Sequence, residues 1–325
     1  MKEEEIRKRE AFNRYLELVK KDAKKFFHHK SFIRINCPAC NKNNFTEEFE
    51  KYGFKYVTCK NCSTLFVNPR PHFNTLKDFY SDSPSTKFWV NKFFKPVAQI
   101  RRKKIFAPRA EYINKFLKKN KQLVIGDIGA GFGLFLEELR KYNSANRYIA
   151  IEPSQEMAKI CSSKKLDVKC LCLEEIKGME GSFNLLTAFE LLEHLYDPVA
   201  FLKKAYSLLK PGGYLLLTTL NGLGFDIMLL WEKSKSIAAP QHLNFFNPES
   251  IKLLMRKIGF KIIEVQTPGK LDLDIVEQAI KKDGVDLGIF WNFLAKEGSE
   301  NSKIDLQGWI SRNGLSSHMR ILAKK

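Results

Sequence analysis

Four cysteines near the start of the chain have the spacing of a metal site. Cys37 and Cys40 form one Cys-x-x-Cys pair, Cys59 and Cys62 form a second, and eighteen residues separate the inner cysteines. This spacing is typical of tetrathiolate zinc. Four thiolates fill the tetrahedral ion and leave no open position, so such a site is structural and takes no part in catalysis. The sequence therefore predicts a structural metal ion, with zinc preferred and iron left open.

The residues between the two pairs predict a zinc ribbon. Gly53 lies at the middle of this stretch, with aromatic and β-branched residues on both sides, as in a β-hairpin. Zinc ribbons often bind nucleic acid. Glu47, Glu48 and Glu50 lie in the same stretch and would repel phosphates, so they weaken that interpretation.

A second candidate site is the glycine-rich stretch "VIGDIGAGFG". Asp127 ends a predicted strand, and Gly129, Gly131 and Gly133 form a turn that lets the backbone approach a ligand before a helix begins. A dinucleotide-binding fingerprint would require its third glycine at the position of Leu134, so the stretch departs from that pattern.

Glu152 ends the next predicted strand, in "IAIEP". An acid at the end of a second strand commonly accepts hydrogen bonds from the hydroxyls of a ribose. The alternative for Glu152 is a structural role as a helix cap.

The elements that must position these residues begin at residue 122, where apolar strands alternate with amphipathic helices. This alternation predicts an α/β fold with a doubly wound, mostly parallel sheet. Strands are expected at 122–128, 147–153, 168–172, 183–189, 213–220, 261–266 and 318–325, and helices at 134–142, 154–165, 198–210 and 247–260. We expect "PGG" to close the helix at 198–210 and residues 270–315 to form a less regular insertion with helical pieces.

The first third of the chain is strongly basic. The net charge is +19, and residues 1–120 hold 28 Lys and Arg against 12 Asp and Glu, which accounts for sixteen of these charges. Residues 3–30 predict a basic amphipathic helix. The expected domains are an N-terminal basic helix (1–34), a zinc ribbon (35–71), a helical cap or linker (72–120) and a catalytic domain (121–325).

The N-terminus has no apolar core of the kind that a signal peptide needs, and the longest apolar runs are far shorter than the roughly 20 residues that span a bilayer. A cytoplasmic, reducing location with no membrane insertion is therefore expected. Cys161, Cys170 and Cys172 are expected to be buried filler residues and not nucleophiles.

Four stretches together resemble the motifs of class I S-adenosylmethionine-dependent methyltransferases. They are "DIGAGFG", "IEP", "FNLLTAFELLEHLYDP" and "LLKPGGYLLLTTLNG", and the resemblance covers about residues 105–325. The chain is most similar to the branch that includes ubiquinone-pathway O-methyltransferases and methyltransferases of surface-polysaccharide gene sets, some of which carry an N-terminal zinc module. The resemblance implies a Rossmann-like sheet of seven strands with the last strand antiparallel, S-adenosylmethionine as cofactor, and methyl transfer as the reaction.

The same resemblance implies where the cofactor would bind. Asp127 would approach the methionine amino group, Glu152 would hold the ribose, and Leu173 and Glu174 would flank the adenine. The full set of implied cofactor-binding residues is Asp127, Gly129, Ala130, Gly131, Gly133, Glu152, Pro153, Leu173, Glu174, Ala188 and Phe189.

A hydroxyl acceptor must lose its proton as it attacks, so a general base or a metal ion is expected near the methyl group. "ELLEH" offers Glu190, Glu193 and His194, and "APQHLNFF" offers His242. This order of residues resembles the divalent-metal site of the small-RNA 3′-end 2′-O-methyltransferases, so it implies a candidate Mg²⁺ site. Two alternatives stay open: His242 as a base without a metal, and a structural role for both histidines.

The sequence leaves three hypotheses for function. The first is methyl transfer to a hydroxyl of a sugar, a nucleotide-sugar or a glycan precursor, with the ribbon and residues 72–120 closing over the acceptor. The second is methyl transfer to a ribose hydroxyl of RNA, and the third is a non-enzymatic adaptor. The predicted fourth strand ends in "AFELLEH" and not in Asn-Pro-Pro-Tyr, so the chain does not resemble enzymes that methylate the amino group of a flipped base. The oligomeric state is left open.

Overall fold

The computed structural model describes residues 2–27, 32–117 and 122–325. Internal contacts divide the chain into two units, and each unit is described by itself. Unit 1 comprises Met1–Val97, Thr219–Ile251 and Gln266–Met319, and unit 2 comprises Ala98–Thr218, Lys252–Val265 and Arg320–Lys325. Residues 219–251 and 266–319, which we expected in the catalytic domain, are thus grouped with the N-terminal region. The domain ranges expected from the sequence stay predictions.

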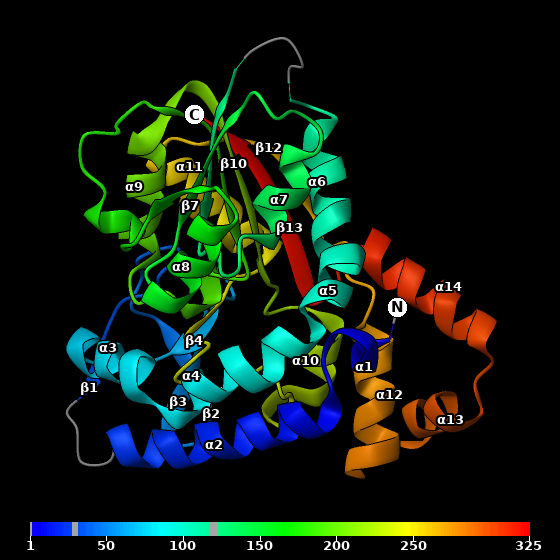
Figure 1. Ribbon diagram of the computed structural model, residues 1–325. Helices are drawn as coiled ribbons and strands as arrows, with labels where there is room; N and C mark the ends of the chain where they lie inside the picture. The colour runs from blue at the N-terminus through cyan, green and yellow to red at the C-terminus, as the bar shows by residue number, and fades with distance from the viewer. Residues whose placement is uncertain (1, 28–31, 118–121) are drawn as a thin grey trace. The chain divides into compact units, whose positions relative to one another are not determined.

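Unit 2 is built on a seven-stranded sheet with the order β12-β13-β10-β9-β6-β7-β8 (Figure 1). The strands are β6 (Val124–Ile128), β7 (Arg147–Ile151), β8 (Asp167–Lys169), β9 (Phe183–Phe189), β10 (Leu209–Leu220), β12 (Lys261–Gln266) and β13 (His318–Lys324). β6 pairs in parallel with β7 and β9, and β9 pairs in parallel with β10. Because parallel strands share one direction, the residues that follow β6, β7 and β9 gather at the same edge.

The last strand runs against its neighbour. Lys325 N donates to Gly213 O over 2.9 Å, whereas at the other end of the pair Asn221 N donates to Ser317 O over 2.8 Å. The residue number rises along β13 while it falls along β10, so the two strands are antiparallel. The expected sheet of seven strands, with its last strand reversed, is confirmed.

Helices cover the sheet of unit 2, and its core includes Ile125, Leu136, Ala150, Leu185 and Leu216. The helices are α5 (Ala98–Arg101), η3 (Arg102–Phe106), α6 (Ala107–Asn114), α7 (Leu134–Arg140), α8 (Gln155–Ser163), η4 (Leu173–Glu175), η5 (Leu192–His194), α9 (Pro198–Leu208) and α11 (Pro248–Ile258), the last of which begins in unit 1.

The expectation that "PGG" closes the helix at 198–210 is wrong. α9 already ends at Leu208, and Leu209 pairs with Phe183 as the first residue of β10. The register then shifts between Leu209 and Tyr214, which places "PGG" in an irregularity of the strand. Leu208 and Leu209 are both fully buried, so the chain turns into the sheet before the proline is reached.

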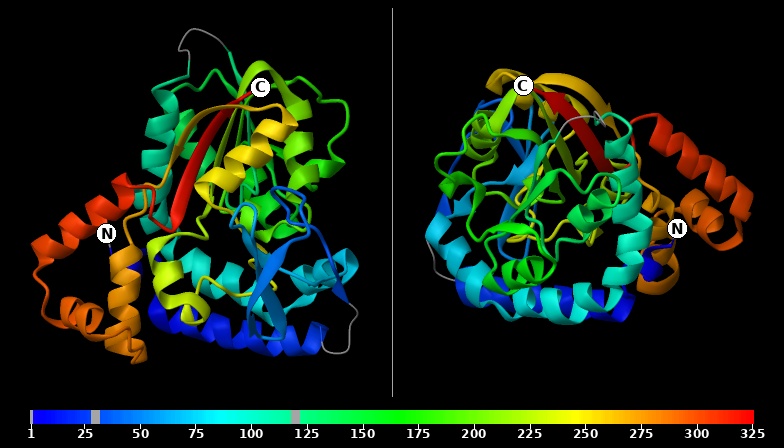
Figure 2. Two further views of the ribbon diagram at one scale, coloured as in Figure 1. Left: turned by 180° about the vertical axis from the view of Figure 1, so that it is seen from behind. Right: turned by 45° about the horizontal axis from the view of Figure 1, so that its top comes forward.

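Unit 1 contains a four-stranded sheet with the order β11-β4-β3-β2. Its strands are β2 (Phe45–Lys51), β3 (Phe54–Cys59), β4 (Leu65–Val67) and β11 (Asn244–Phe245), and β1 (Phe32–Ile33) pairs separately with β5 (Arg70–Pro71). Tyr52 and Gly53 connect β2 to β3 with φ angles of 57° and 82°, which is the turn geometry that matches the twist of a hairpin. The predicted hairpin is confirmed, and Figure 2 shows it in the view from behind.

The expected helix over residues 3–30 is interrupted. The chain forms α1 (Glu3–Ile6) and α2 (Arg9–Phe27), and Arg7 between them has extended backbone with φ −153°. Residues 28–30 lie outside the described part. The tip of the ribbon hairpin packs on α2, because Tyr52 contacts the cluster that contains Phe12 and Tyr15. The helices that follow the ribbon are α3 (Phe73–Asp82), α4 (Pro84–Phe88), η1 (Trp89–Phe94) and η2 (Lys95–Val97).

The insertion at 270–315 is more regular than expected. It consists of α12 (Asp272–Asp283), α13 (Ile289–Glu297) and α14 (Glu300–Arg312), and α10 (Phe225–Leu230) and η6 (Trp231–Lys233) also belong to unit 1. α12 has acids in its first turn, lysines in its last turn and Gly284 as a left-handed cap, all of which stabilise a helix.

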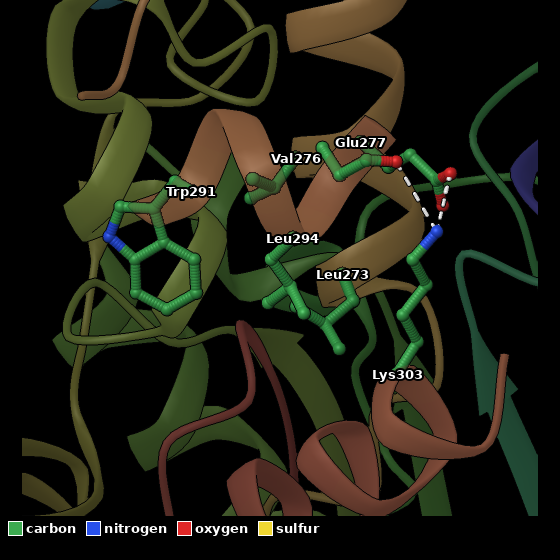
Figure 3. Close-up of a pocket in the computed structure, with 7 residues that line it drawn as sticks. Leu273, Val276, Glu277, Trp291, Leu294 and Lys303 are labelled. Atoms are coloured by element: carbon green, nitrogen blue, oxygen red, sulfur yellow. Dashed lines mark hydrogen bonds and ion pairs between the residues drawn. The ribbon is translucent and has the colours of Figure 1, made fainter. Parts of the chain in front are cut away.

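A small cavity of about 20 Å³ lies among the three helices of the insertion, closed on one side by the ion pair of Lys303 and Glu277 (Figure 3). This volume is too small for a substrate, so we interpret it as a packing feature. Within the three described ranges, no helix combines the length and the apolar character needed to cross a membrane.

Two glycine substitutions should change stability in opposite directions. A Cβ at Gly126 would lie 2.7 Å from side-chain atoms of Leu186 and Phe183, so Gly126→Ala should lower the free energy of unfolding by about 1–3 kcal/mol. At Gly308, in α14, a Cβ would meet only the flexible end of Arg312, so Gly308→Ala should raise it by about 0.5–1 kcal/mol. Urea unfolding measures both, and equal effects of the two variants would contradict the packing of β6 on β9.

Candidate functional site

The four predicted metal ligands of unit 1 lie together. The Sγ atoms of Cys37, Cys40, Cys59 and Cys62 all lie within 4.8 Å of one another, with Cys37 and Cys62 separated by 3.5 Å and Cys40 and Cys59 by 3.4 Å. A tetrahedral zinc ion with bonds of about 2.3 Å would require sulfur separations of about 3.8 Å. The donor set therefore fits zinc, and all four positions of the ion would be filled by protein.

The two cysteine pairs are held by the same backbone turn. Asn41 N donates to Cys37 O over 2.9 Å, and Ser63 N donates to Cys59 O over 2.8 Å. Asn41 and Ser63 each follow the second cysteine of a pair, and both have left-handed backbone with φ of 63° and 54°. Residues other than glycine rarely adopt this backbone conformation unless their surroundings enforce it. The duplicated turn directs all four thiols toward one point, as a structural metal site requires.

The glycine-rich turn of unit 2 connects β6 to α7. Gly129, Gly131 and Gly133 all have positive φ, between 54° and 68°. A Cβ at Gly133 would lie 2.7 Å from Leu166, so this glycine is required by packing. A Cβ at Gly131 would meet nothing within 4 Å, so the open space above this residue can receive a ligand. The turn thus has the form of a cradle.

Glu152 is bonded to this cradle. Its Oε2 accepts a hydrogen bond from Gly131 N over 2.8 Å, and its Oε1 accepts one from Ser154 N over 2.9 Å. Burial raises the pKa of Glu152, and the two backbone donors partly offset that rise. Glu152 therefore orders the glycine-rich turn, a role that the helix-cap and ribose alternatives did not include.

The remaining residues that the sequence assigned to the cofactor also lie in unit 2. Ala130 N donates to Ile151 O over 3.4 Å, within the turn that Glu152 orders, and Pro153 directly follows that acid. Leu173 and Ala188 are buried, whereas Glu174 is exposed. All eleven of the predicted cofactor residues therefore belong to a single unit.

Asp127 lies at the end of β6, and only 3% of its surface is exposed. Its Oδ1 accepts a hydrogen bond from the Thr187 hydroxyl over 2.6 Å. Burial raises the pKa of the Asp127 carboxyl to about 7, while the bond from Thr187 and the positive charge of Arg109 act in the opposite direction. Asp127 is therefore a carboxyl group that titrates near neutral pH.

Arg109 was not predicted from the sequence. Its guanidinium lies 4.5 Å from the centre of the Phe189 ring, and its Nη2 donates to Glu190 Oε1 over 2.9 Å. Thr218 also donates to Glu190 Oε1, and Glu190 N donates to Thr218 O over 2.9 Å. The only signal for Arg109 in the sequence is a single arginine in the otherwise weakly polar stretch "FAPRAEYI".

Glu190 has a left-handed backbone, with φ of 51°. A residue other than glycine keeps this conformation only where its surroundings enforce it, and such residues gather at functional sites. Here the surroundings are Arg109 and Thr218. The carboxylate of Glu190 thus fixes the turn that follows β9.

The predicted catalytic residues are divided between the two units. Glu193 is buried in unit 2, and its Oε1 lies 4.0 Å from Nε2 of His194. His242 belongs to unit 1, where its Nδ1 lies 2.6 Å from the carbonyl oxygen of Ser236. A carbonyl oxygen only accepts hydrogen bonds, so Nδ1 carries the proton and Nε2 of the neutral ring carries the lone pair.

The expectation for the other cysteines is partly wrong. Cys161 is buried and packs against the glycine-rich turn, with its Sγ 3.2 Å from Gly131 O. Cys170 and Cys172 are exposed, because β8 at the edge of the sheet ends at Lys169 before either is reached.

A family model described as a methyltransferase domain matches residues 99–265, which is just over half of the chain. The chain belongs to the S-adenosylmethionine-dependent methyltransferases. The family, the enzyme class and the cofactor expected from the sequence are thereby confirmed, and the hypothesis of a non-enzymatic adaptor is not supported. The matched range of this methyltransferase excludes both the ribbon and the helices α12, α13 and α14.

Curated relatives of the methyltransferase include ubiquinone biosynthesis O-methyltransferases. The protein of Xanthomonas axonopodis pv. citri (strain 306) is 29% identical over 170 residues, which cover 48% of this chain and 70% of the relative. The protein of Xanthomonas campestris pv. campestris (strain B100) is 36% identical over 102 residues, which cover 29% of this chain and 42% of the relative.

One solved structure supports the fold of the methyltransferase, and a second is similar to a lesser degree. A Haloferax volcanii complex of the Trm112 methyltransferase activator contains a chain with a TM-score of 0.51 and 13% identity, covering 73% of this chain and 95% of that chain. A methyltransferase of Thermotoga maritima has a TM-score of 0.49 and 22% identity, with coverages of 73% and 96%. At these identities the likeness concerns the fold alone.

Cofactor binding should depend on the ionisation of Asp127. The carboxylate attracts the cofactor ammonium group only when it is ionised, so the dissociation constant of S-adenosylmethionine should rise about tenfold per unit as pH falls below about 7. Thr187→Val removes a donor that lowers the pKa of Asp127 and should shift this dependence to higher pH. Asp127→Asn should bind weakly at every pH. Calorimetric titrations between pH 5.5 and 7.5 measure all three, and a pH-independent affinity of the parent protein would contradict this role.

Proposed function

We propose that the protein transfers a methyl group from S-adenosylmethionine to a hydroxyl of a small polyhydroxylated acceptor: a sugar, a nucleotide-sugar or a glycan precursor. The observation that carries the proposal is the cradle at Gly131, ordered by Glu152, in a chain that belongs to the methyltransferase family. Hydroxyl transfer is favoured because curated relatives are named as O-methyltransferases.

The cofactor would be held entirely by residues of unit 2. Asp127 would attract the ammonium group, Gly129 and Gly131 would let the backbone approach the ligand, and Glu152 would accept hydrogen bonds from the ribose. Leu173 and Glu174 would flank the adenine. When bound, the cofactor supplies an already activated methyl group, so the protein contributes mainly positioning.

His242 is the proposed general base. His242 would accept the hydroxyl proton on Nε2 while the acceptor oxygen took the methyl group that the bound cofactor would supply, with the sulfur of the cofactor as leaving group. The bond from Nδ1 to Ser236 O keeps the lone pair on Nε2, which is the tautomer that this step needs. S-adenosylhomocysteine and the methyl ether are the products.

The Mg²⁺ interpretation of Glu190, Glu193, His194 and His242 stays a prediction from the sequence. Within unit 2 the carboxylate of Glu190 already accepts bonds from Arg109 and Thr218. These donors favour a positioning role for Glu190 over metal ligation. Glu193, His194 and His242 remain the candidate ligands. A chelator too weak to remove zinc tests this interpretation: loss of turnover would support the metal ion, and undiminished turnover would reject it.

The choice of a sugar as the acceptor class rests on the ribbon and on the insertion. Both lie outside the range matched by the family model, so this chain adds to the methyltransferase domain parts that can select an acceptor. The resemblance to polysaccharide-cluster methyltransferases with a zinc module supports the same class. A basic N-terminal third suits an acceptor that carries phosphates, such as a nucleotide-sugar.

RNA is the second candidate, favoured by the same basic charge. Against it, Glu47, Glu48 and Glu50 are exposed on β2, where they would repel a phosphate backbone. Binding to RNA would have to fall steeply with salt concentration if this candidate were correct.

The decisive assay follows the methyl label from tritiated S-adenosylmethionine into nucleotide-sugars and total RNA offered separately. We expect label in the nucleotide-sugar fraction. Label found only in RNA would move the proposal to that acceptor class. No binding of the cofactor by the parent protein would contradict every enzymatic interpretation.

His242→Asn should lower kcat for the labelled acceptor by about 10²–10⁴-fold, because it removes the base. The dissociation constant of His242→Asn for S-adenosylmethionine should stay within about twofold of the parent value, since the proposed cofactor residues all lie in unit 2. The matched control is His72→Asn, at an exposed residue before α3. An undiminished kcat for His242→Asn would exclude it as the base.

A further inference from the structure

The segment that carries His242, residues 236–247, lies against the zinc ribbon within unit 1. We propose that the ribbon positions His242, so that the metal-stabilised fold of residues 37–67 determines the orientation of the catalytic base. This inference rests on the proposed function, because it assigns a task to the ribbon in the same reaction. Four groups of contacts carry it.

The first contact is backbone pairing. Asn244 and Phe245 form β11, which pairs antiparallel with β4 through Phe66 and Leu65. Val67 N also donates to Leu243 O over 3.0 Å. The residue directly after His242 is therefore already bonded to the ribbon, and the sheet of the ribbon is completed by a strand from a distant part of the sequence.

The second contact comes from the hairpin. Tyr56, in β3, is fully buried, and its hydroxyl accepts a hydrogen bond from Ala239 N over 2.7 Å. Ala239 lies three residues before His242 in the same segment. The segment is thus bonded to the ribbon on both sides of the imidazole.

The third contact is made by a buried arginine. Arg70, in β5, is 1% exposed, and its Nη2 donates to Asn244 Oδ1 over 3.1 Å. Tyr80, in α3, adds a hydrogen bond from its hydroxyl to Gln241 O over 3.2 Å. Both residues follow the ribbon in the chain. Arg70 holds the side chain of Asn244 and Tyr80 holds the backbone of Gln241, on either side of His242 and Leu243.

The fourth contact reaches the metal-binding turn itself. Nδ2 of Asn247 donates to the carbonyl oxygens of Cys62 and Ser63 over 2.8 and 3.0 Å. Its Oδ1 meanwhile caps α11 by accepting from Glu249 N and Ser250 N. Asn247 therefore joins the turn of a predicted metal ligand to the end of the segment that carries His242.

Together these contacts hold the segment at Ala239, Leu243, Asn244 and Asn247. Within the segment, Ser236 O accepts the proton of His242 Nδ1. If the backbone between Ser236 and His242 changes conformation, this hydrogen bond is lost and the imidazole can change tautomer. Tyr56 and Asn247 are accordingly positioning residues that act on the base through the backbone.

Two variants test this inference in the full-length, zinc-loaded protein. Tyr56→Phe removes only the acceptor for Ala239 N. Asn247→Asp keeps the oxygen that caps α11 and replaces the donor to Cys62 and Ser63 with a second oxygen. The matched control is Tyr52→Phe, which removes a hydroxyl from the same hairpin and leaves the segment's bonds in place.

The measurements are amide hydrogen exchange of residues 236–247 and ¹⁵N spectra of the histidine rings, with His242 assigned from its missing signal in His242→Gln. Tyr56→Phe and Asn247→Asp should each speed exchange in this segment about tenfold and reduce the share of the Nδ1–H tautomer of His242. Exchange in β6 should stay within about twofold of the parent protein, as should all signals of Tyr52→Phe.

Unchanged exchange and an unchanged tautomer in both variants would overturn the inference. Neither readout needs an acceptor or turnover, so this failure is distinguishable from a failure of the proposed function. If one variant does not fold, the other still decides, because the two variants remove different contacts.

Discussion

The pairing of β11 with β4 is the interaction on which unit 1 depends. β11 is only two residues long, and β4 is three, so neither would be stable without the hairpin and the cysteine cluster beside them. Two equivalent turns hold the four thiols, and the segment around His242 is bonded to this part of the ribbon. In a region of this size a bound metal ion would add stability that a larger domain gains from its core.

Unit 2 holds charged groups in a largely apolar environment. Asp127, Glu152 and Glu190 lie at the ends of β6, β7 and β9, and each accepts hydrogen bonds from a defined donor. Arg109 offsets part of the cost of burying Asp127 and also forms an ion pair with the half-buried Glu190. The protein therefore keeps three carboxyl groups at one edge of the sheet, where parallel topology brings the strand ends together and where a positively charged cofactor is expected.

The sequence predicts the sheet of unit 2 well because each strand is a short apolar run bounded by turn residues, as in "FNLLTAF". The cysteine cluster could be predicted equally well, because the spacing of metal ligands is a local property of the sequence. The sequence predicts neither Arg109 nor β11, because their contacts are not local in the chain. Asn244 and Phe245 have no periodicity of their own, and they pair with residues nearly 180 positions earlier in the chain. The role of Glu152 in ordering Gly131 likewise depends on a contact across strands that spacing alone does not show.

We propose that the zinc ribbon supports His242, the proposed base, and takes no part in holding the cofactor. A calorimetric titration of S-adenosylmethionine into the zinc-loaded parent protein and into Cys59→Ser tests it most directly. Cys59→Ser removes one of the four ligands, so its zinc content should fall, while the residues proposed to bind the cofactor all lie in unit 2. We expect the two dissociation constants to agree within about twofold. Loss of cofactor binding in Cys59→Ser, with the sheet of unit 2 still folded, would contradict it.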